Sequence, residues 1–255
     1  MPSANGNYYF LHEADDPATP PMLLIHGAGG SHLHWAPDIR RLNGFKVIAL
    51  DLPGHGKSEG IGRQTIQDYV DAVQDFIDEM DLPPVVIVGH SMGSAIAMQM
   101  TLDAPDRVLA LVMVSGGSRL RVNPSIMENA ANPATFPLAV KTINEWAFGS
   151  QADPRLRELA ANRMEKETRP TVLHGDFVAC NDFNATERLA EIKKPTLIIC
   201  GSDDKMTPFK HSLALHEAIP GSDLVEIEGA GHMVGLEKPH EVAEALEEFM
   251  KNVNQ

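Results

Sequence analysis

The stretch VVIVGHSMGSAIAMQM, residues 85–100, carries the strongest structural signal in this chain, because a polar serine interrupts a long apolar run. The apolar residues before the serine predict a buried strand, and those after it predict an apolar helix. Ser91 therefore lies at a sharp strand-to-helix turn within the pattern Gly-x-Ser-x-Gly. Side chains two positions to either side would collide in such a turn, and Gly89 and Gly93 remove that collision. The alternative is a serine that only caps the helix.

Outward from this turn, short aliphatic runs and amphipathic patterns alternate along the chain. The runs predict strands buried on both faces at residues 22–25, 46–50, 85–88, 110–114, 196–200 and 223–227. Helices are expected at residues 65–80, 92–102 and 239–250, the first with Thr65 and Asp68 as a capping box. Alternation of this kind predicts an α/β fold with a mostly parallel sheet covered on both faces.

The alternation stops between residues 119 and 187, where prolines punctuate helical segments and no strand pattern occurs. We expect a helical cap, inserted into a core made of residues 1–118 and 188–255. Phe136, Trp146, His174 and Phe177 are the candidates in the cap for lining a substrate pocket. For any one of them, packing inside the cap is the alternative, because apolar residues at helical spacing usually bury against each other.

Composition narrows the classes of partner. The chain has 255 residues and a formal net charge of -14, which disfavours nucleic acid and anionic membranes and biases the protein mildly towards neutral or cationic substrates. No apolar run approaches the roughly 20 residues of a membrane span, and the N-terminus has no export-signal pattern. Only two cysteines occur, without metal spacing. We expect a cytoplasmic protein with a small-molecule substrate, and the sequence leaves its oligomeric state open.

A serine hydroxyl is a weak nucleophile without a base and a group that orients the base. Residues 196–200 are followed by a turn with two carboxylates, Asp203 and Asp204, before an expected helix with Thr207 as N-cap and Pro208 as first residue. Residues 223–227 are followed by a glycine-flanked histidine, His232. The order along the chain is serine, aspartate, histidine.

These motifs resemble those of the α/β-hydrolase superfamily of serine esterases and related enzymes. The resemblance covers nearly the whole chain, through residues 26–30 (HGAGG), 51–58 (DLPGHGKS), 89–93 (GHSMG), 201–208 (GSDDKMTP) and 229–232 (GAGH). It implies a catalytic triad of Ser91, Asp204 and His232, since the family pattern G-x-x-D-x-x-x-P selects Asp204 over Asp203. It also implies an oxyanion hole built from the backbone N–H groups of Ala28 and Met92, and no cofactor.

The remaining histidines and glycines have less specific interpretations. His32 and His34 form an H-x-H pair without a third ligand nearby, so a surface or pocket-lining role is favoured over a metal site. His55 is expected to be structural, and His90 to pack or hydrogen-bond. The glycines at residues 27–30 do not complete a nucleotide-binding pattern.

The resemblance therefore implies a serine hydrolase, a carboxylesterase acting through an acyl-enzyme. Ser91 argues against the dehalogenase and epoxide hydrolase branches of the superfamily, which use aspartate at this position. C–C bond hydrolases, lactonases and lyases of the same fold stay open, because fold and triad do not determine the substrate. A ligand sensor that retains the triad is the alternative from a different class.

Overall fold

The computed structural model describes residues 2–14, 16 and 19–253. Residues 1, 15, 17, 18, 254 and 255, which the sequence analysis assigned to the core, lie outside the described residues. One eight-stranded sheet with the order β1-β2-β4-β3-β5-β6-β7-β8 forms the centre of the protein. The strands are β1 (Ser3–Ala4), β2 (Asn7–His12), β3 (Met22–Ile25), β4 (Val47–Leu50), β5 (Val85–His90), β6 (Val108–Val114), β7 (Thr196–Gly201) and β8 (Asp223–Ile227).

The strands from β4 to β8 along this order are parallel, and the β1–β2 and β2–β4 pairs are antiparallel. This confirms the predicted mostly parallel sheet, and all six expected strands lie within two residues of their predicted bounds. β5 is central and buried along its whole length. Its last residue, His90, pairs with Val114 at the carboxyl end of β6. The following residue, Ser91, is thus delivered to the edge where parallel strands end.

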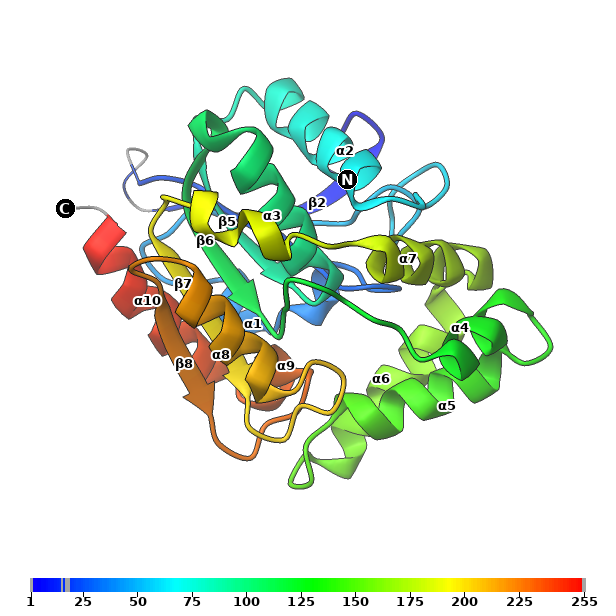
Figure 1. Ribbon diagram of the computed structural model, residues 1–255. Coiled ribbons are helices and arrows are strands. Elements are labelled where there is room, and N and C mark those ends of the chain that lie inside the picture. Colours follow the sequence, from blue (N-terminus) through cyan, green and yellow to red (C-terminus); the bar gives the residue numbers. More distant parts are fainter. Residues whose placement is uncertain (1, 15, 17–18, 254–255) are drawn as a thin grey trace.

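Helices cover both faces of the sheet (Figure 1). Helices α2 (Ile66–Glu79), α3 (Met92–Asp103) and α8 (Phe209–Ala218) contribute to one apolar cluster, and α1 (Pro37–Arg40), α9 (Val234–Glu237) and α10 (Pro239–Val253) to the other. The 3₁₀ helices η1 (His32–His34), η2 (Pro105–Arg107) and η3 (Thr186–Glu191) lie in the connections. The predicted helix at residues 65–80 is confirmed, and the Thr65 hydroxyl accepts a hydrogen bond from the Asp68 N–H at its start.

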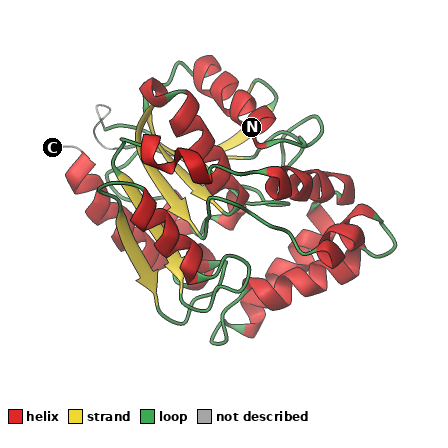
Figure 2. Cartoon of the chain, viewed as in Figure 1, coloured by secondary structure: helices red, strands yellow, loops and turns green. Residues whose placement is uncertain are grey.

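Four helices lie between β6 and β7 and are called here the four-helix segment: α4 (Pro124–Ala131), α5 (Phe136–Ala147), α6 (Pro154–Glu167) and α7 (Pro170–Asp182). Each has proline at its first or second position, where the missing N–H costs no hydrogen bond. The segment has an apolar cluster of its own. Figure 2 shows these helices grouped beside the sheet and joined by loops.

An isolated antiparallel bridge between Arg119 and Asn184 joins the chain just before this segment to the chain just after it. Phe183 and Leu189, which follow α7, pack in an apolar cluster of the core rather than in that of the segment. The expected boundaries at residues 119 and 187 stay a prediction.

The observed elements differ from the expected ones in three places. β8 is an edge strand and is not buried on both faces, since Asp223 and Glu226 are exposed. β1 and β2 were not predicted at all. Helix α8 begins at Phe209 after Pro208 as N-cap, one residue later than predicted, because the Thr207 side chain bonds to Asp204 and Ser115 instead of capping the helix.

Among the described residues, no helix has both the length and the apolar character needed to cross a bilayer.

Candidate active site

Ser91 occupies a strained turn between β5 and α3. Its φ of 54° lies in the left-handed region that a non-glycine residue rarely adopts. The backbone holds this conformation, because the Ser91 N–H donates to the Val114 carbonyl at 2.9 Å and the Ser91 carbonyl accepts from the Ser94 hydroxyl at 2.6 Å. The Ser91 side chain makes no capping hydrogen bond, which removes the helix-cap alternative.

The two glycines of the turn are required by close backbone contacts. A Cβ at Gly89 would overlap the Gly93 carbonyl, and a Cβ at Gly93 would overlap the Ile25 carbonyl of β3. The collision expected from the sequence is therefore real at both positions. β3, β5 and α3 meet so closely here that only glycine fits.

Asp204 and His232 form a buried hydrogen-bonded pair at the ends of β7 and β8. His232 Nδ1 lies 2.9 Å from Asp204 Oδ2. The Asp204 carboxylate also accepts the N–H groups of Met206 and Thr207, each at 2.8 Å, and lies 2.7 Å from the Thr207 hydroxyl. Burial alone would raise the pKa of Asp204, but His232 and the Thr207 hydrogen bonds outweigh it and lower the pKa to about 2.

The neighbouring Asp203 has a different environment. Its carboxylate points to the four-helix segment, where it accepts hydrogen bonds from the Ser150 N–H at 3.1 Å and hydroxyl at 2.8 Å. Asp203 makes no hydrogen bond to His232 among the described residues. The geometry agrees with the choice of Asp204 over Asp203 as the partner of the histidine.

His90 supports His232 from the other side. His90 Nε2 donates to the His232 carbonyl at 2.9 Å, and the two rings lie 5.0 Å apart. Burial, followed by the nearby His232, lowers the pKa of His90 to about 3, so its ring is neutral at physiological pH. The hydrogen-bonding role expected for His90 agrees with this arrangement.

The loop after β3 passes directly beside Ser91. A Cβ at Gly27 would lie 3.0 Å from His90 Nδ1 and 3.1 Å from Ser91 Cβ, so the loop approaches the serine at backbone distance. Ala28 follows and lines the same cavity as Ser91. Met92 is the first residue of α3, where backbone N–H groups have no acceptor within the helix.

The four-helix segment holds this loop at Gly29. The Gly29 N–H donates to the Asp176 carboxylate of α7 at 2.8 Å, and the Gly29 carbonyl accepts from the Thr168 hydroxyl at 2.7 Å. Asp176 is fully buried and also bonds to His55 Nε2 at 2.8 Å and to the Tyr69 hydroxyl. The structural role expected for His55 agrees with its buried contact to Asp176.

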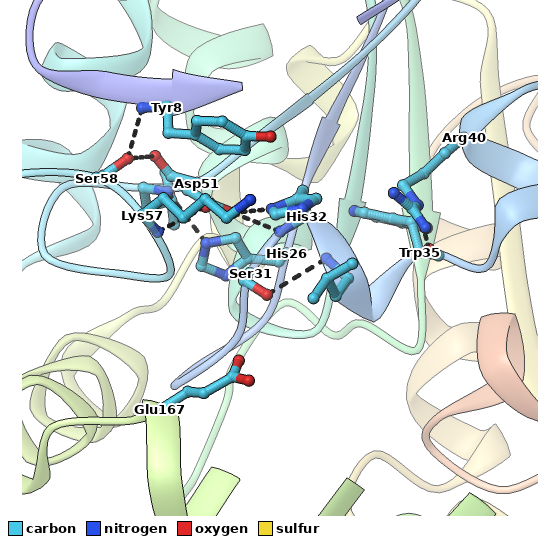
Figure 3. A network of polar contacts seen from close by, with 12 residues as sticks. Tyr8, His26, Ser31, His32, Trp35, Arg40, Asp51, Lys57, Ser58 and Glu167 are labelled. Carbon is cyan, nitrogen blue, oxygen red and sulfur yellow. Dashed lines mark hydrogen bonds and ion pairs between the residues drawn. The ribbon is translucent and has the colours of Figure 1, made fainter. Parts of the chain in front are cut away.

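A second network of hydrogen bonds holds the loop after β3 further along the chain, at His32 (Figure 3). The Asp51 carboxylate accepts the His32 N–H at 2.5 Å, lies 2.8 Å from His32 Nδ1 and accepts the Lys57 N–H at 2.9 Å. The Ser58 hydroxyl links the Asp51 carbonyl to the Tyr8 N–H of β2. The expectation for His32 was wrong, because this buried side chain bonds to Asp51 and lies neither on the surface nor in a pocket.

A cavity of about 310 Å³ lies between the sheet and the four-helix segment, and both Ser91 and His232 line it. Trp146 and Phe177 line it, as expected, and so does His34. A smaller cavity of about 60 Å³ adjoins it and shares lining residues with it, His34 among them.

Phe136 and His174 were expected to line the cavity, but neither of them does. Phe136 is buried within the apolar cluster of the four-helix segment. On α7 the lining residues are Leu173, Phe177 and Cys180, and His174 is rotated by about 100° from Leu173 on the helix surface. The sequence indicated a helix here but not which of its faces meets the core.

Sequence reasoning missed Asp176 and Thr168. Asp176 is the only Asp, Glu, Lys or Arg between Arg169 and Asp182, and an isolated carboxylate in an apolar helix is a usable signal for a buried, partnered group. Thr168 carries no such signal. Among the described residues, no group of three or more His, Cys, Asp or Glu side chains is placed to hold a metal ion.

Comparison with known proteins identifies the family to which this fold belongs. A family model described as alpha/beta hydrolase fold matches residues 20–239, and the chain belongs to this family. A protein of Acinetobacter baylyi named (E)-2-((N-methylformamido)methylene)succinate hydrolase is 27% identical over 241 residues, covering 91% of this chain and 90% of that one. The fold expected from the resemblance is thus confirmed.

Two further relatives are hydrolases as well. A 2-hydroxy-6-oxononadienedioate/2-hydroxy-6-oxononatrienedioate hydrolase of Escherichia coli is 28% identical over 236 residues, covering 83% of this chain and 80% of the relative. The solved structure of a thermophilic esterase is 33% identical with a TM-score of 0.81, covering 97% of this chain and 98% of that one. The relatives thus include different hydrolytic activities on one fold.

Proposed function

We propose that this protein hydrolyses carboxylic esters of small to medium-sized molecules through Ser91, His232 and Asp204. The observation that carries the proposal is that His232, hydrogen-bonded to Asp204, lines the same cavity as Ser91 on its strained turn. The similarity to a thermophilic esterase supports the ester as substrate. Two free, buried cysteines agree with the cytoplasmic location expected from the sequence.

In the proposed reaction, His232 Nε2 takes the proton of the Ser91 hydroxyl while Oγ attacks the ester carbonyl carbon. Asp204 holds the Nδ1–H of the ring and stabilises the imidazolium that forms. The N–H groups of Ala28 and Met92 donate to the oxyanion. His232 then protonates the departing alcohol, and water, activated by the same histidine, releases the acid from Ser91.

One contact of this mechanism is not made at rest. No hydrogen bond among the described residues joins Ser91 Oγ to His232 Nε2. Catalytic hydrogen bonds are often long before substrate binds and shorten in the reactive complex. We therefore expect substrate binding to bring these two atoms together.

Cleavage of a carbon–carbon bond, which the resemblance leaves open, is the second candidate, and the Escherichia coli relative named 2-hydroxy-6-oxononadienedioate/2-hydroxy-6-oxononatrienedioate hydrolase favours it. The same serine and histidine would act in either reaction. An assay with a 2-hydroxy-6-oxo-dienoate separates this candidate from the ester hydrolase. Cleavage of that substrate is measured as the loss of its ultraviolet absorbance.

The experiment is hydrolysis of p-nitrophenyl esters, from short to long acyl chains, by the purified protein and by Ser91→Ala. We expect many turnovers by the wild type and background rates from the variant. Ser212→Ala, which changes a buried serine on α8 away from the cavity, is the matched control and should retain activity. Equal rates from wild type and Ser91→Ala would contradict the proposal, and a single covalent event without turnover would favour a sensor.

A further inference from the structure

The cavity lined by Ser91 is rimmed by positive charge, although the protein is acidic. Arg119, Arg121 and Lys205 are exposed and line it, and no aspartate or glutamate is among its lining residues. The whole chain carries 35 acidic and 21 basic residues. The charge at this opening is therefore opposite in sign to that of the protein.

Neutral partners hold both arginines in place. Arg119 Nε donates to the Asn184 side-chain oxygen and Arg121 Nη1 to the Asn181 carbonyl, each at 2.9 Å. A guanidinium has five N–H donors in a planar fork. Each arginine is thus anchored at one nitrogen and keeps donors for a further acceptor.

Within the described part of the chain, no ion pair joins a carboxylate to any of these three cations. The ion pairs between described residues engage other lysines and arginines. Asp203 lies near Lys205 in the turn. Hydrogen bonds from Ser150 lower its pKa most and the charge of Lys205 lowers it further, but it forms no ion pair with Lys205 and does not line the cavity. The free donors at the rim remain available to a ligand.

The interior of the cavity differs from its rim. Apolar side chains of the four-helix segment, including Ile126, Ile143 and Phe177, line it together with Ser91 and His232. A ligand that reaches from the rim to Ser91 therefore passes an apolar stretch, which suits an aliphatic chain with a polar group at each end.

We infer that the substrate carries a carboxylate at the end remote from its ester, bound by Arg119, Arg121 and Lys205. This inference rests on the proposed function for the position of the ester. The planar fork of arginine pairs with carboxylate through two parallel hydrogen bonds, and a cleft of one charge sign concentrates ligands of the other. Monoesters of aliphatic dicarboxylic acids fit this pattern, contrary to the bias towards neutral or cationic substrates expected from the net charge.

The first test compares kcat/KM for mono-p-nitrophenyl adipate and p-nitrophenyl hexanoate, which have acyl chains of equal length and differ in the terminal carboxylate. We expect the wild type to favour the adipate ester, and the variant Arg119→Gln/Arg121→Gln/Lys205→Gln to lower this preference about 10- to 100-fold. Arg155→Gln/Lys166→Gln/Lys193→Gln removes three exposed cations that do not line the cavity and is the matched control. Added salt should reduce the preference of the wild type.

A binding measurement keeps the inference testable without turnover. Calorimetry on Ser91→Ala compares the monoanilide of adipic acid with hexanoic anilide, neither of which is an ester. We expect the charged anilide to bind more tightly than the neutral one. If this difference is lost when the three rim cations are replaced but kept in the control variant, the inference is supported even if no ester is cleaved and the proposed function fails. Equal binding of both anilides, or equal losses in both triple variants, overturns it.

Discussion

At the scale of single residues, the adjacent carboxylates Asp203 and Asp204 have separate roles, and their amide variants should show it. Asp204→Asn leaves His232 Nδ1 without its anionic acceptor. Removal of the orienting carboxylate in the best-studied serine hydrolase triad lowers turnover about 10⁴-fold, and we expect a loss of several hundredfold or more here. Asp203→Asn removes the negative charge beside Ser150 and Lys205 but leaves the pair of His232 and Asp204 intact, so it should retain activity. Steady-state hydrolysis of one p-nitrophenyl ester measures both, and comparable losses would contradict the assignment.

At the scale of elements, the four-helix segment is hydrogen-bonded to the loop that carries the proposed oxyanion donor Ala28. Thr168→Val removes the hydroxyl that donates to Gly29 and keeps the shape of the side chain. Since one neutral hydrogen bond contributes about 0.5–1.5 kcal/mol, we expect kcat to fall about 2- to 10-fold while KM changes less. Thr142→Val, which removes a hydrogen bond within α5, is the control. A change in KM alone would place Thr168 in substrate binding rather than in positioning the loop.

The elements also show what one sequence can and cannot predict. β5, the turn at Ser91 and α3 were predictable, because buried strands and tight turns impose local residue patterns. β8 was assigned correctly as a strand but not as an edge strand, since neighbours in a sheet are chosen by tertiary pairing. In the four-helix segment, prolines marked the helix starts, but the faces that line the cavity depend on how the helices dock. Phe177 and His174 lie on one helix, and only the first lines the cavity.

At the scale of the whole molecule, buried neutral histidines link stability to pH. Burial, with a further contribution from His55, lowers the pKa of His26 to about 4, and burial with His232 lowers that of His90 to about 3. Both nitrogens of His26 have partners, since Nδ1 lies 2.8 Å from the Gly27 carbonyl and Nε2 accepts the Leu52 N–H at 3.1 Å. Protonation at Nε2 would place the Nε2–H opposite the Leu52 N–H, so that two donors face each other without an acceptor. The folded state therefore disfavours the charged form of His26.

Histidines of the unfolded chain titrate near pH 6.5, so below this pH the unfolded state binds more protons than the folded state. Stability is therefore fully present above pH 6.5 and falls as the pH drops towards 4. Each such histidine contributes a slope of about 1.4 kcal/mol per pH unit, and His26 and His90 together lower the free energy of unfolding by about 2 kcal/mol between about pH 6 and about pH 5.

Two other groups also change the slope. Burial lowers the pKa of His34, which adds to the slope, and burial raises the pKa of Glu237, which opposes it through a single group and cannot cancel the contributions of several histidines. Burial alone would lower the pKa of His55, but Asp176 outweighs burial and the pKa is raised. The stability that His55 contributes is therefore fully present below pH 6.5 and stays nearly constant between about pH 6 and about pH 5. The lowered pKa of Asp204 gives stability that is lost only below the ordinary carboxyl range. Urea unfolding at a series of pH values from about 7 to about 4.5 measures the slope. A free energy of unfolding that stays constant over this range would show that these histidines accept protons in the folded protein, and would contradict the buried, neutral network that supports the Ser91 turn.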